Sequence, residues 1–282
     1  MVSSKPDLDQ AVAAALAEDL GDRNLDVTTA SVVDSDLMGE AVVVARKPGV
    51  VSGSDAAARV FDMVRPRCDY VALVPDGTRV EAGDAVARLS GPLSAILIGE
   101  RTALNFLQRM SGIATLTRRY ADALAPFPTV ALLDTRKTTP GLRFLERAAV
   151  RAGGGHNHRD GLWDAVLIKD NHVAAAGGVT EAVARARRAA MPVEVEVETL
   201  EQLAEALDSG AEIVLLDNMP VELMRRAVEI TAGRAKLEAS GGMTLEGAVA
   251  AAKAGVDRIS VGALTHSAPA LDLSLEVTRT WR

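Results

Sequence analysis

The second half of the chain repeats one pattern, in which a short apolar run ends in a polar residue and mostly leads into a helix-like segment. The six runs lie at 130–134, 165–169, 193–197, 213–217, 236–240 and 258–262. Strands that alternate with helices predict a parallel sheet covered by helices. Six such units, with room for one more, favour a (β/α) barrel, complete or incomplete. A flat doubly wound sheet is the alternative, but no Gly-x-Gly-x-x-Gly turn follows the first run.

The first hundred residues mix strands with helices instead of repeating one unit. The predicted elements are a helix at 9–20, a strand at 40–47, a helix at 54–64, a turn–strand–turn segment at 74–84 and a long amphipathic helical stretch at 94–125. We expect the long stretch to be broken near Ser111 and Gly112. We therefore predict an α/β protein of two domains, with residues 1–110 in the first and residues 111–269 in the second. The segment 270–282 is a candidate to return to the first domain.

The composition is that of a globular protein. Of 282 residues, 48% are hydrophobic and 24% charged, which excludes global disorder. A single cysteine, Cys68, excludes an intramolecular disulfide and any multi-cysteine metal site. The net charge of −7 argues against nucleic-acid and membrane-surface partners. No apolar run reaches the ~20 residues that a membrane span requires. We expect a soluble, cytoplasmic protein.

Polar residues at the ends of the predicted strands are sorted by type along the chain. In (β/α) barrels, working residues lie where strands enter the following loops. The strand-end residues are Arg136 and Lys137, Lys169, Glu196, Asp217, the Ser240-Gly241-Gly242 loop and Gly262. They form a series of cations, then carboxylates, then small residues. This order predicts one site at one end of the barrel.

The carboxylates divide into two groups by strand periodicity. Side chains alternate along a strand, so Glu194 and Glu196 share a face, as do Lys236 and Glu238. Buried charges must be paired, and we expect Glu194 and Glu238 to pair structurally with Lys236 or with arginines. Glu196 and Asp217, on neighbouring strand ends, are candidate magnesium ligands, because Mg²⁺ takes one or two carboxylates and substrate phosphate.

The small and cationic residues predict an anionic small-molecule ligand. The Ser240-Gly241-Gly242 loop precedes an alanine-rich helix, and residues 261–266 offer a second loop, which together favour phosphate binding. Arg136 and Arg159 can bind planar carboxylates bidentately. We expect His156 to face solvent and His158 to contact substrate. A zinc site at these histidines would need a third ligand, from His172 or a carboxylate, and is not favoured.

Several long residue blocks resemble the quinolinate phosphoribosyltransferase family, which is also called carboxylating nicotinate-nucleotide pyrophosphorylase. The most specific blocks are Asp134-Thr135-Arg136-Lys137-Thr138-Thr139-Pro140-Gly141, Gly153-Gly154-Gly155-His156-Asn157-His158-Arg159 and Leu167-Ile168-Lys169-Asp170-Asn171-His172. Further similar blocks stand at 18–21, 26–29, 100–105, 194–197, 215–218, 240–242 and 261–266. They follow in order over almost the whole chain.

The resemblance implies a small α/β sandwich domain plus an incomplete, seven-stranded α/β barrel, in a homodimer or hexamer. It implies that Arg136, Arg159 and Lys169 hold the two carboxylates of quinolinate, beside His158. Arg101 would reach in from the other subunit. Phosphoribosyl pyrophosphate and Mg²⁺ would be held by Lys137, Glu196, Asp217, the loop of Ser240, Gly241 and Gly242, and the loop from Gly262 to His266, which includes Ala263. Thr135 and Val261 are further expected substrate-binding residues. The catalytic residues would be Lys137, Lys169, Glu196 and Asp217.

The implied reaction transfers a phosphoribosyl group to quinolinate with decarboxylation, giving nicotinate mononucleotide for NAD biosynthesis, pyrophosphate and CO2. Two other functions stay open. One is a barrel lyase or aldolase that uses Lys169 as a Schiff-base amine. The other is a non-catalytic, anion-binding accessory protein of a transport system.

Overall fold

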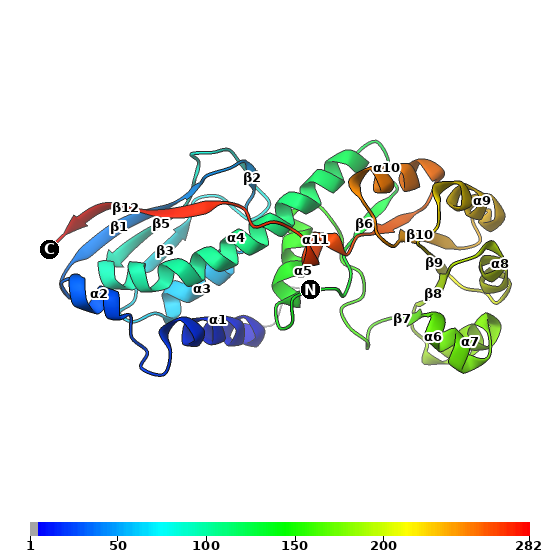
Figure 1. Cartoon of the computed structure of the whole chain (residues 1–282), viewed down its shortest axis with the longest axis horizontal. Coiled ribbons are helices and arrows are strands. Elements are labelled where there is room, and N and C mark those ends of the chain that lie inside the picture. The colour runs from blue at the N-terminus through cyan, green and yellow to red at the C-terminus, as the bar shows by residue number, and fades with distance from the viewer. Residues whose placement is uncertain (1–4) are drawn as a thin grey trace. The chain divides into compact units, whose positions relative to one another are not determined.

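The structure, a computed structural model, describes residues 5–282 of the chain (Figure 1). The chain forms two compact units. The first comprises the residues up to Arg118, Thr138–Gly154 and Ser267–Arg282, and the second comprises Arg119–Lys137 and Gly155–His266. Among the described residues, no helix is both long and apolar enough to cross a membrane.

The first unit is built on an antiparallel sheet with the strand order β12-β1-β5-β3. Its strands are β1 (Met38–Ala45), β3 (Asp69–Ala72), β5 (Ala85–Pro92) and β12 (Leu273–Trp281), beside a two-stranded sheet of β2 (Gly49–Val50) and β4 (Arg79–Val80). Burial alternates along β1, so that one face of the sheet forms the core. The C-terminal strand β12 pairs along the whole of β1, which places the end of the chain in this sheet.

Close helix packing completes the first unit. Its helices are α1 (Lys5–Leu20), α2 (Val27–Val32), α3 (Ser54–Met63), the first part of α4 (Leu93–Leu124) and α5 (Arg143–Ala152). Phe61 of α3 stacks on Tyr70 of β3, with ring centroids 5.9 Å apart. A Cβ atom at Gly99 of α4 would lie 2.5 Å from the Phe61 ring. The glycine therefore lets α4 approach α3 closely.

The predicted break near Ser111 and Gly112 is wrong, because α4 runs without interruption through both residues. Their small side chains serve tertiary contacts instead. The buried Ser111 hydroxyl accepts the Ser52 N–H at 2.9 Å. A Cβ atom at Gly112 would lie 2.1 Å from the Pro269 carbonyl oxygen. Small residues in a helix can thus mark a close neighbour as well as a helix end.

Residues 138–154, which the sequence assigns to the second domain, belong to the first unit. The reason lies in α5, which contacts α4. Buried Glu146 accepts a hydrogen bond from Arg109 at 2.9 Å. A Cβ atom at Gly153 would lie 2.5 Å from the Ala114 carbonyl oxygen. A boundary at a single residue therefore cannot describe this chain.

The second unit contains a parallel sheet with the strand order β6-β11-β10-β9-β8-β7. Its strands are β6 (Ala131–Leu133), β7 (Val166–Ile168), β8 (Val193–Val197), β9 (Ile213–Asp217), β10 (Lys236–Ser240) and β11 (Arg258–Ser260). His156 adds a parallel bridge to Leu133 at the β6 edge. All six apolar runs are strands, and the α/β fold with an incomplete barrel is confirmed.

Helices follow the strands of this sheet and cover its outer face (Figure 1). The covering helices are α6 (Asp170–Ala176), α7 (Val179–Ala186), α8 (Leu200–Asp208), α9 (Val221–Thr231) and α10 (Leu245–Ala254). The short 3-10 helix η1 (Arg187–Ala189) follows α7, and the short helix α11 (Ala263–His266) follows β11. Because all strands run in parallel, their carboxyl ends meet at one edge of the sheet. The predicted polar strand ends are therefore brought together there.

Candidate active site

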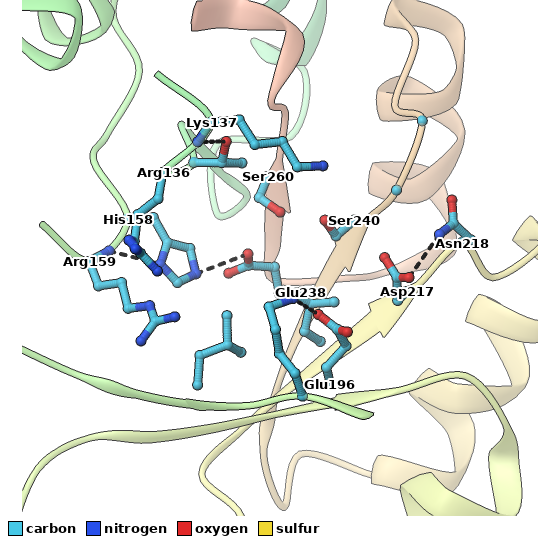
Figure 2. Close-up of a pocket in the computed structure, with 16 residues that line it drawn as sticks. Arg136, Lys137, His158, Arg159, Glu196, Asp217, Asn218, Glu238, Ser240 and Ser260 are labelled. Carbon is cyan, nitrogen blue, oxygen red and sulfur yellow. Dashed lines mark hydrogen bonds and ion pairs between the residues drawn. The ribbon is translucent and has the colours of Figure 1, made fainter. Parts of the chain in front are cut away.

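A cavity of about 600 Å³ lies at the carboxyl ends of the strands in the second unit. Most of the predicted site residues line it: Thr135, Arg136, Lys137, His158, Arg159, Lys169, Glu196, Asp217, Ser240, Gly241 and Gly242. Figure 2 shows the labelled side chains grouped around one space, with cations and carboxylates both represented. Residues scattered over more than a hundred positions of the chain thus converge on one site.

The predicted residues outside this lining are Arg101, Val261, Gly262, Ala263 and His266. Arg101 is exposed on α4, in the part of that helix that belongs to the first unit. The 261–266 loop adjoins the cavity through Lys137. A Cβ atom at Gly262 would lie 3.1 Å from Lys137 Cδ. Thr265 donates its hydroxyl hydrogen to the Lys137 carbonyl at 2.8 Å. This loop therefore contacts both the backbone and the side chain of Lys137.

Asp134, at the end of β6, fixes the loop that carries the histidines. It is fully buried. One carboxylate oxygen accepts the Asn157 side-chain amide at 2.6 Å and the other accepts the His158 backbone N–H at 2.7 Å. A buried carboxylate needs such donors. The loop backbone is therefore held in one position relative to β6.

Arg136 and Arg159 form the cationic side of the cavity (Figure 2). Burial, and then the charge of Arg136, lower the pKa of Arg159, while Glu194 and Asp164 act in the opposite direction. Two guanidinium groups near each other repel, and a dianionic ligand between them would relieve that repulsion. The Arg159 guanidinium also donates to the Ala165 carbonyl at 3.2 Å, which orients it.

Lys169 and Glu196 form an ion pair across the ends of β7 and β8. The sequence analysis assigns Lys169 to a substrate carboxylate and Glu196 to a metal. The two residues contact each other because β7 and β8 are neighbours in the sheet. The Lys169 backbone N–H donates to His172 Nδ1 at 2.9 Å. His172 therefore caps the start of α6, a role that explains it without zinc.

The phosphate-type loop after β10 is shaped by its backbone. Gly241 and Gly242 have positive φ values of +93° and +50°. A Cβ atom at Gly241 would lie 2.3 Å from Asn218 Oδ1, and the Asn218 N–H donates to the Ser240 carbonyl at 2.9 Å. The Tyr120 hydroxyl donates to the Met243 carbonyl at 3.1 Å. The loop is thus held from both sides before α10 begins.

Asp217 lies beside Asn218, whose side-chain amide donates to it at 2.8 Å (Figure 2). Five further residues that line the cavity were not predicted to bind a ligand: Leu167, Leu215, Asn218, Glu238 and Ser260. Strand periodicity predicts Glu238 on the same face as Ser240. This alternation could have placed Glu238 at the cavity, because Ser240, on the same face, begins the loop that lines the cavity.

The expected pairing of Glu194 and Glu238 with Lys236 is wrong. Lys236 stands at the exposed amino end of β10, where its ammonium group contacts Asp257 at 2.6 Å. Glu238 instead forms an ion pair with Arg258, whose Nε lies 2.9 Å from a Glu238 carboxylate oxygen, so the expectation of an arginine partner holds for this residue. Both glutamates also contact His158 Nε2, at 3.0 Å for Glu194 and 3.3 Å for Glu238.

His158 is therefore held between the buried carboxylates of Glu194 and Glu238 on one side and the Arg159 backbone on the other. Figure 2 shows the contacts of His158 with Glu238 and Arg159. Burial alone would lower the pKa of His158, but the hydrogen bonds and charges of Glu194 and Glu238 outweigh it and raise the pKa to about 9. Because the pKa of His158 is higher in the folded than in the unfolded chain, protonation of this ring stabilises the fold. The stabilisation is fully present below the ordinary pKa of ~6.5 and is lost as the pH rises through about 9.

One contact of His158 opposes its protonation. Its Nδ1 accepts the Arg159 N–H at 2.8 Å, which requires a ring nitrogen without hydrogen. One neutral hydrogen bond contributes about 1 kcal/mol, whereas each tenfold change in proton binding corresponds to about 1.4 kcal/mol. The carboxylates of Glu194 and Glu238 favour the protonated ring, and a second proton on Nδ1 would replace the Arg159 hydrogen bond.

His158, Glu194 and Glu238 also bring three possible metal-ligand atoms within 4.8 Å of one another. A hydrogen occupies Nε2 in either ring state, so this nitrogen has no lone pair for a metal. Arg258 already neutralises one oxygen of Glu238. With His158 protonated, two positive charges balance two negative ones, and the group is a buried ion cluster.

Comparisons with known proteins show which family the chain resembles. Residues 26–111 match the quinolinate phosphoribosyl transferase N-terminal domain, and residues 113–276 match the C-terminal domain. A probable carboxylating nicotinate-nucleotide pyrophosphorylase of Bacillus subtilis is 44% identical over 260 residues, covering 90% of each chain. The carboxylating nicotinate-nucleotide pyrophosphorylase of Mycobacterium leprae is 46% identical over 270 residues, covering 93% of this chain and 94% of that one.

Solved structures extend the likeness to the fold. The nicotinate-nucleotide pyrophosphorylase of Francisella tularensis superposes with a TM-score of 0.93 at 40% identity, covering 98% of both chains. NadC of Streptococcus pyogenes gives a TM-score of 0.92 at 38% identity, covering all of this chain and 99% of that one. The two matched domains together span most of the sequence. The chain therefore belongs to the quinolinate phosphoribosyltransferase family.

Proposed function

We propose that the chain transfers the phosphoribosyl group of phosphoribosyl pyrophosphate to quinolinate, releasing pyrophosphate and CO2 and giving nicotinate mononucleotide. The observation that carries the proposal is the 600 Å³ cavity, where Arg136, Arg159 and Lys169 meet Glu196, Asp217 and a glycine loop. The same cavity therefore contains cationic side chains that can bind a dianion and backbone N–H groups that can bind phosphate. They suit a reaction that joins two anionic substrates.

Quinolinate has two neighbouring carboxylates, and the cationic side of the cavity supplies partners for both. Arg136 and Arg159 offer planar guanidinium groups, which bind carboxylates bidentately. Lys169 reaches the same cavity from the end of β7. Its contact with Glu196 is an ion pair and not the free amine that a Schiff base requires. This observation favours binding over an aldolase role.

Phosphoribosyl pyrophosphate would lie on the opposite side, at the loop before α10. The N–H groups of Gly241 and Gly242 and the start of the helix favour phosphate. Lys137, supported by Thr265 and Gly262, would face the pyrophosphate. Holding both substrates in this way can lower the barrier by several kcal/mol, roughly 7–11 in the best oriented cases.

In this arrangement the pyridine nitrogen attacks the ribose carbon and no side-chain nucleophile is needed. The bond to pyrophosphate breaks and positive charge develops on the sugar, as in glycoside chemistry. The ring nitrogen becomes positively charged. The bond from the ring to the adjacent carboxylate can then break and release CO2, with the electron pair left on the ring carbon beside that nitrogen. That carbon takes up a proton from water, which gives nicotinate mononucleotide. Arg136 and Arg159 hold the ring in place during both steps.

Glu196 and Asp217 are the residues that would hold Mg²⁺. They are oxygen donors on the neighbouring strands β8 and β9, next to the phosphate loop, which suits a hard cation. When bound, magnesium would neutralise charge on the departing pyrophosphate. Glu196 would have to exchange its contact with Lys169 for the metal.

Asp217→Asn is expected to raise the magnesium concentration for half-maximal activity by about tenfold or more, since Mg²⁺ takes only one or two protein carboxylates. Asparagine can still accept the Asn218 hydrogen bond, so the loop is expected to stay in place. The measurement is a magnesium titration of initial rates. The exposed Glu222→Gln on α9 is the control, and an unchanged titration for Asp217→Asn would remove it from the site.

We further propose a homodimer in which Arg101 of one subunit completes the cavity of the other. The exposure of Arg101 supports this arrangement. A single buried cysteine suits the reducing cytoplasm, which we propose as the location of the enzyme.

Mixing inactive Arg101→Ala and Lys169→Ala subunits is expected to restore activity. Half of the randomly mixed dimers are hybrids, and each hybrid has one intact site, so about a quarter of wild-type activity should return. The measurement follows pyrophosphate release after subunit exchange. Two copies of the same variant, mixed in parallel, should stay inactive. Exchange without recovery would contradict a shared site.

The reaction itself is tested by incubating the protein with phosphoribosyl pyrophosphate, Mg²⁺ and either quinolinate or nicotinate. Pyrophosphate and CO2 should appear in equal amounts with quinolinate, and little pyrophosphate should appear with nicotinate. Release of pyrophosphate without CO2, or equal use of nicotinate, would overturn the proposed function. No turnover with either substrate would favour a binding protein.

A further inference from the structure

A buried ion cluster lies beneath the cationic side of the cavity. It consists of His158, Glu194, Glu238 and Arg258, and three strands contribute to it. Glu194 comes from β8, Glu238 from β10 and Arg258 from β11. Glu194 is 4% exposed and Glu238 is fully buried. The two carboxylates converge on one imidazole nitrogen, which a purely structural pairing with arginine would not require.

We propose that Glu194 and Glu238 are positioning residues that keep His158 as an imidazolium, so that its ring adds a positive charge to the Arg136 and Arg159 side of the quinolinate site. This inference rests on the proposed function, because it assigns a task to two residues around the same cavity. His158 and Glu238 both line that cavity, while Glu194 contacts the ring from β8, which β9 separates from β10.

The charges around His158 show why the carboxylates are needed. Arg136 and Arg159 line the cavity beside it, and next to such cations a lone histidine would lose its second proton. Glu194 and Glu238 reverse that preference. The charged groups that face or adjoin the ring are Asp134 after β6, Arg136, Arg159, Glu194, Glu238 and, behind Glu238, Arg258.

The geometry also restricts the movement of the ring. Asp134 holds the His158 backbone N–H at 2.7 Å, and Nε2 faces both glutamates. The imidazole thus has one orientation, and its side chain is 11% exposed. A fixed, charged ring differs from a mobile lysine, because it presents its charge without ordering a long side chain. A dianion such as quinolinate is the ligand class that uses three adjacent cations.

This arrangement predicts a pH dependence with a definite sign. The pKa of His158, raised to about 9, keeps the ring charged at neutral pH, and the charge is lost above that value. Quinolinate binding should therefore weaken as the pH rises through about 9. In Glu238→Gln one carboxylate is gone, the pKa should fall toward its ordinary value, and the weakening should begin at lower pH.

The test is a histidine titration by NMR on the whole protein, which has only four histidines. The signal of His158 is assigned by its absence in His158→Asn. We expect the wild-type ring to titrate near pH 9. In Glu238→Gln we expect the affinity of the ring for its second proton to fall by about tenfold or more. The matched control is Glu198→Gln, an exposed carboxylate directly after β8, which should leave the titration unchanged.

Kinetics then separate the two proposals. In Glu238→Gln the KM for quinolinate should rise at a lower pH than in the wild type, while the KM for phosphoribosyl pyrophosphate stays the same. Glu194→Gln repeats the test and leaves the Glu238–Arg258 pair intact, in case Glu238→Gln does not fold. An unchanged His158 titration in both variants would overturn the inference and leave the proposed function intact. So would a shifted titration that the KM for quinolinate does not follow. A wild-type protein that releases no CO2 from quinolinate would overturn the function instead.

Discussion

Arg159→Ala is expected to lower kcat/KM for quinolinate by about 100- to 1,000-fold. Removing one partner of a desolvated, hydrogen-bonded charge pair costs about 2–5 kcal/mol, and every 1.4 kcal/mol is about a factor of ten. Arg159 is part of the cationic side of the cavity and its guanidinium is oriented by the Ala165 carbonyl. The KM for phosphoribosyl pyrophosphate should change little, because the phosphate loop follows a different strand.

The measurement is a pair of steady-state titrations, one for each substrate. Arg159→Lys is the informative control, since it keeps the charge and loses the planar fork. It should recover part of the lost quinolinate use. If both substrates lose the same factor in Arg159→Ala, the assignment of this arginine to quinolinate is wrong.

Gly241→Ala is expected to impair phosphoribosyl pyrophosphate use severely, by about 100-fold in kcat/KM, a loss of the size that follows misplacement by about 1 Å. A Cβ atom there would lie 2.3 Å from Asn218 Oδ1 and 2.7 Å from Asn218 N. The residue also has φ near +93°, which side chains rarely adopt. The loop must therefore move away from Asn218, and with it the N–H groups that would face phosphate.

Gly233→Ala is the matched control for this change. Gly233 also has a positive φ of +77°, but a Cβ atom there would meet nothing within 4 Å. It lies before β10, at the opposite end of the strand from Gly241. Thermal unfolding should show a loss of stability of about 1 kcal/mol in Gly233→Ala and a larger loss in Gly241→Ala, where the Cβ atom also meets Asn218. Only Gly241→Ala should lose activity. Full activity in Gly241→Ala would exclude a phosphate role for the loop.

The strand-and-helix repeat of the second unit could be predicted because it is a local signal. Each apolar run is long enough to be a buried strand, and parallel strands bring their ends together whatever the loops contain. The break expected at Ser111 and Gly112 failed for the opposite reason. Small residues there accommodate Ser52 and Pro269, which are distant in the sequence. Local propensity carries no information on such contacts.

In the candidate site, too, local signals could be predicted and contacts between residues distant in the sequence could not. Strand ends such as Arg136 and Asp217 could be predicted to share an edge. The contact of Lys169 with Glu196 depends on the spatial order of β7 and β8, and the contact of His158 with Glu194 depends on a loop fixed by Asp134. Periodicity places Glu194 on the inner face, but only the fold reveals that its partner is a histidine.

The pairing of β12 with β1 has a consequence for synthesis of the chain. Val42, Val43 and Val44 of β1 leave the ribosome more than two hundred residues before their partners Glu276, Leu275 and Ser274. Until residues 273–281 emerge, an apolar strand has a row of unpaired backbone groups along one side. Such an edge can recruit strands from other nascent chains. Chaperones that cover exposed strands would therefore be needed most before residues 273–281 are translated.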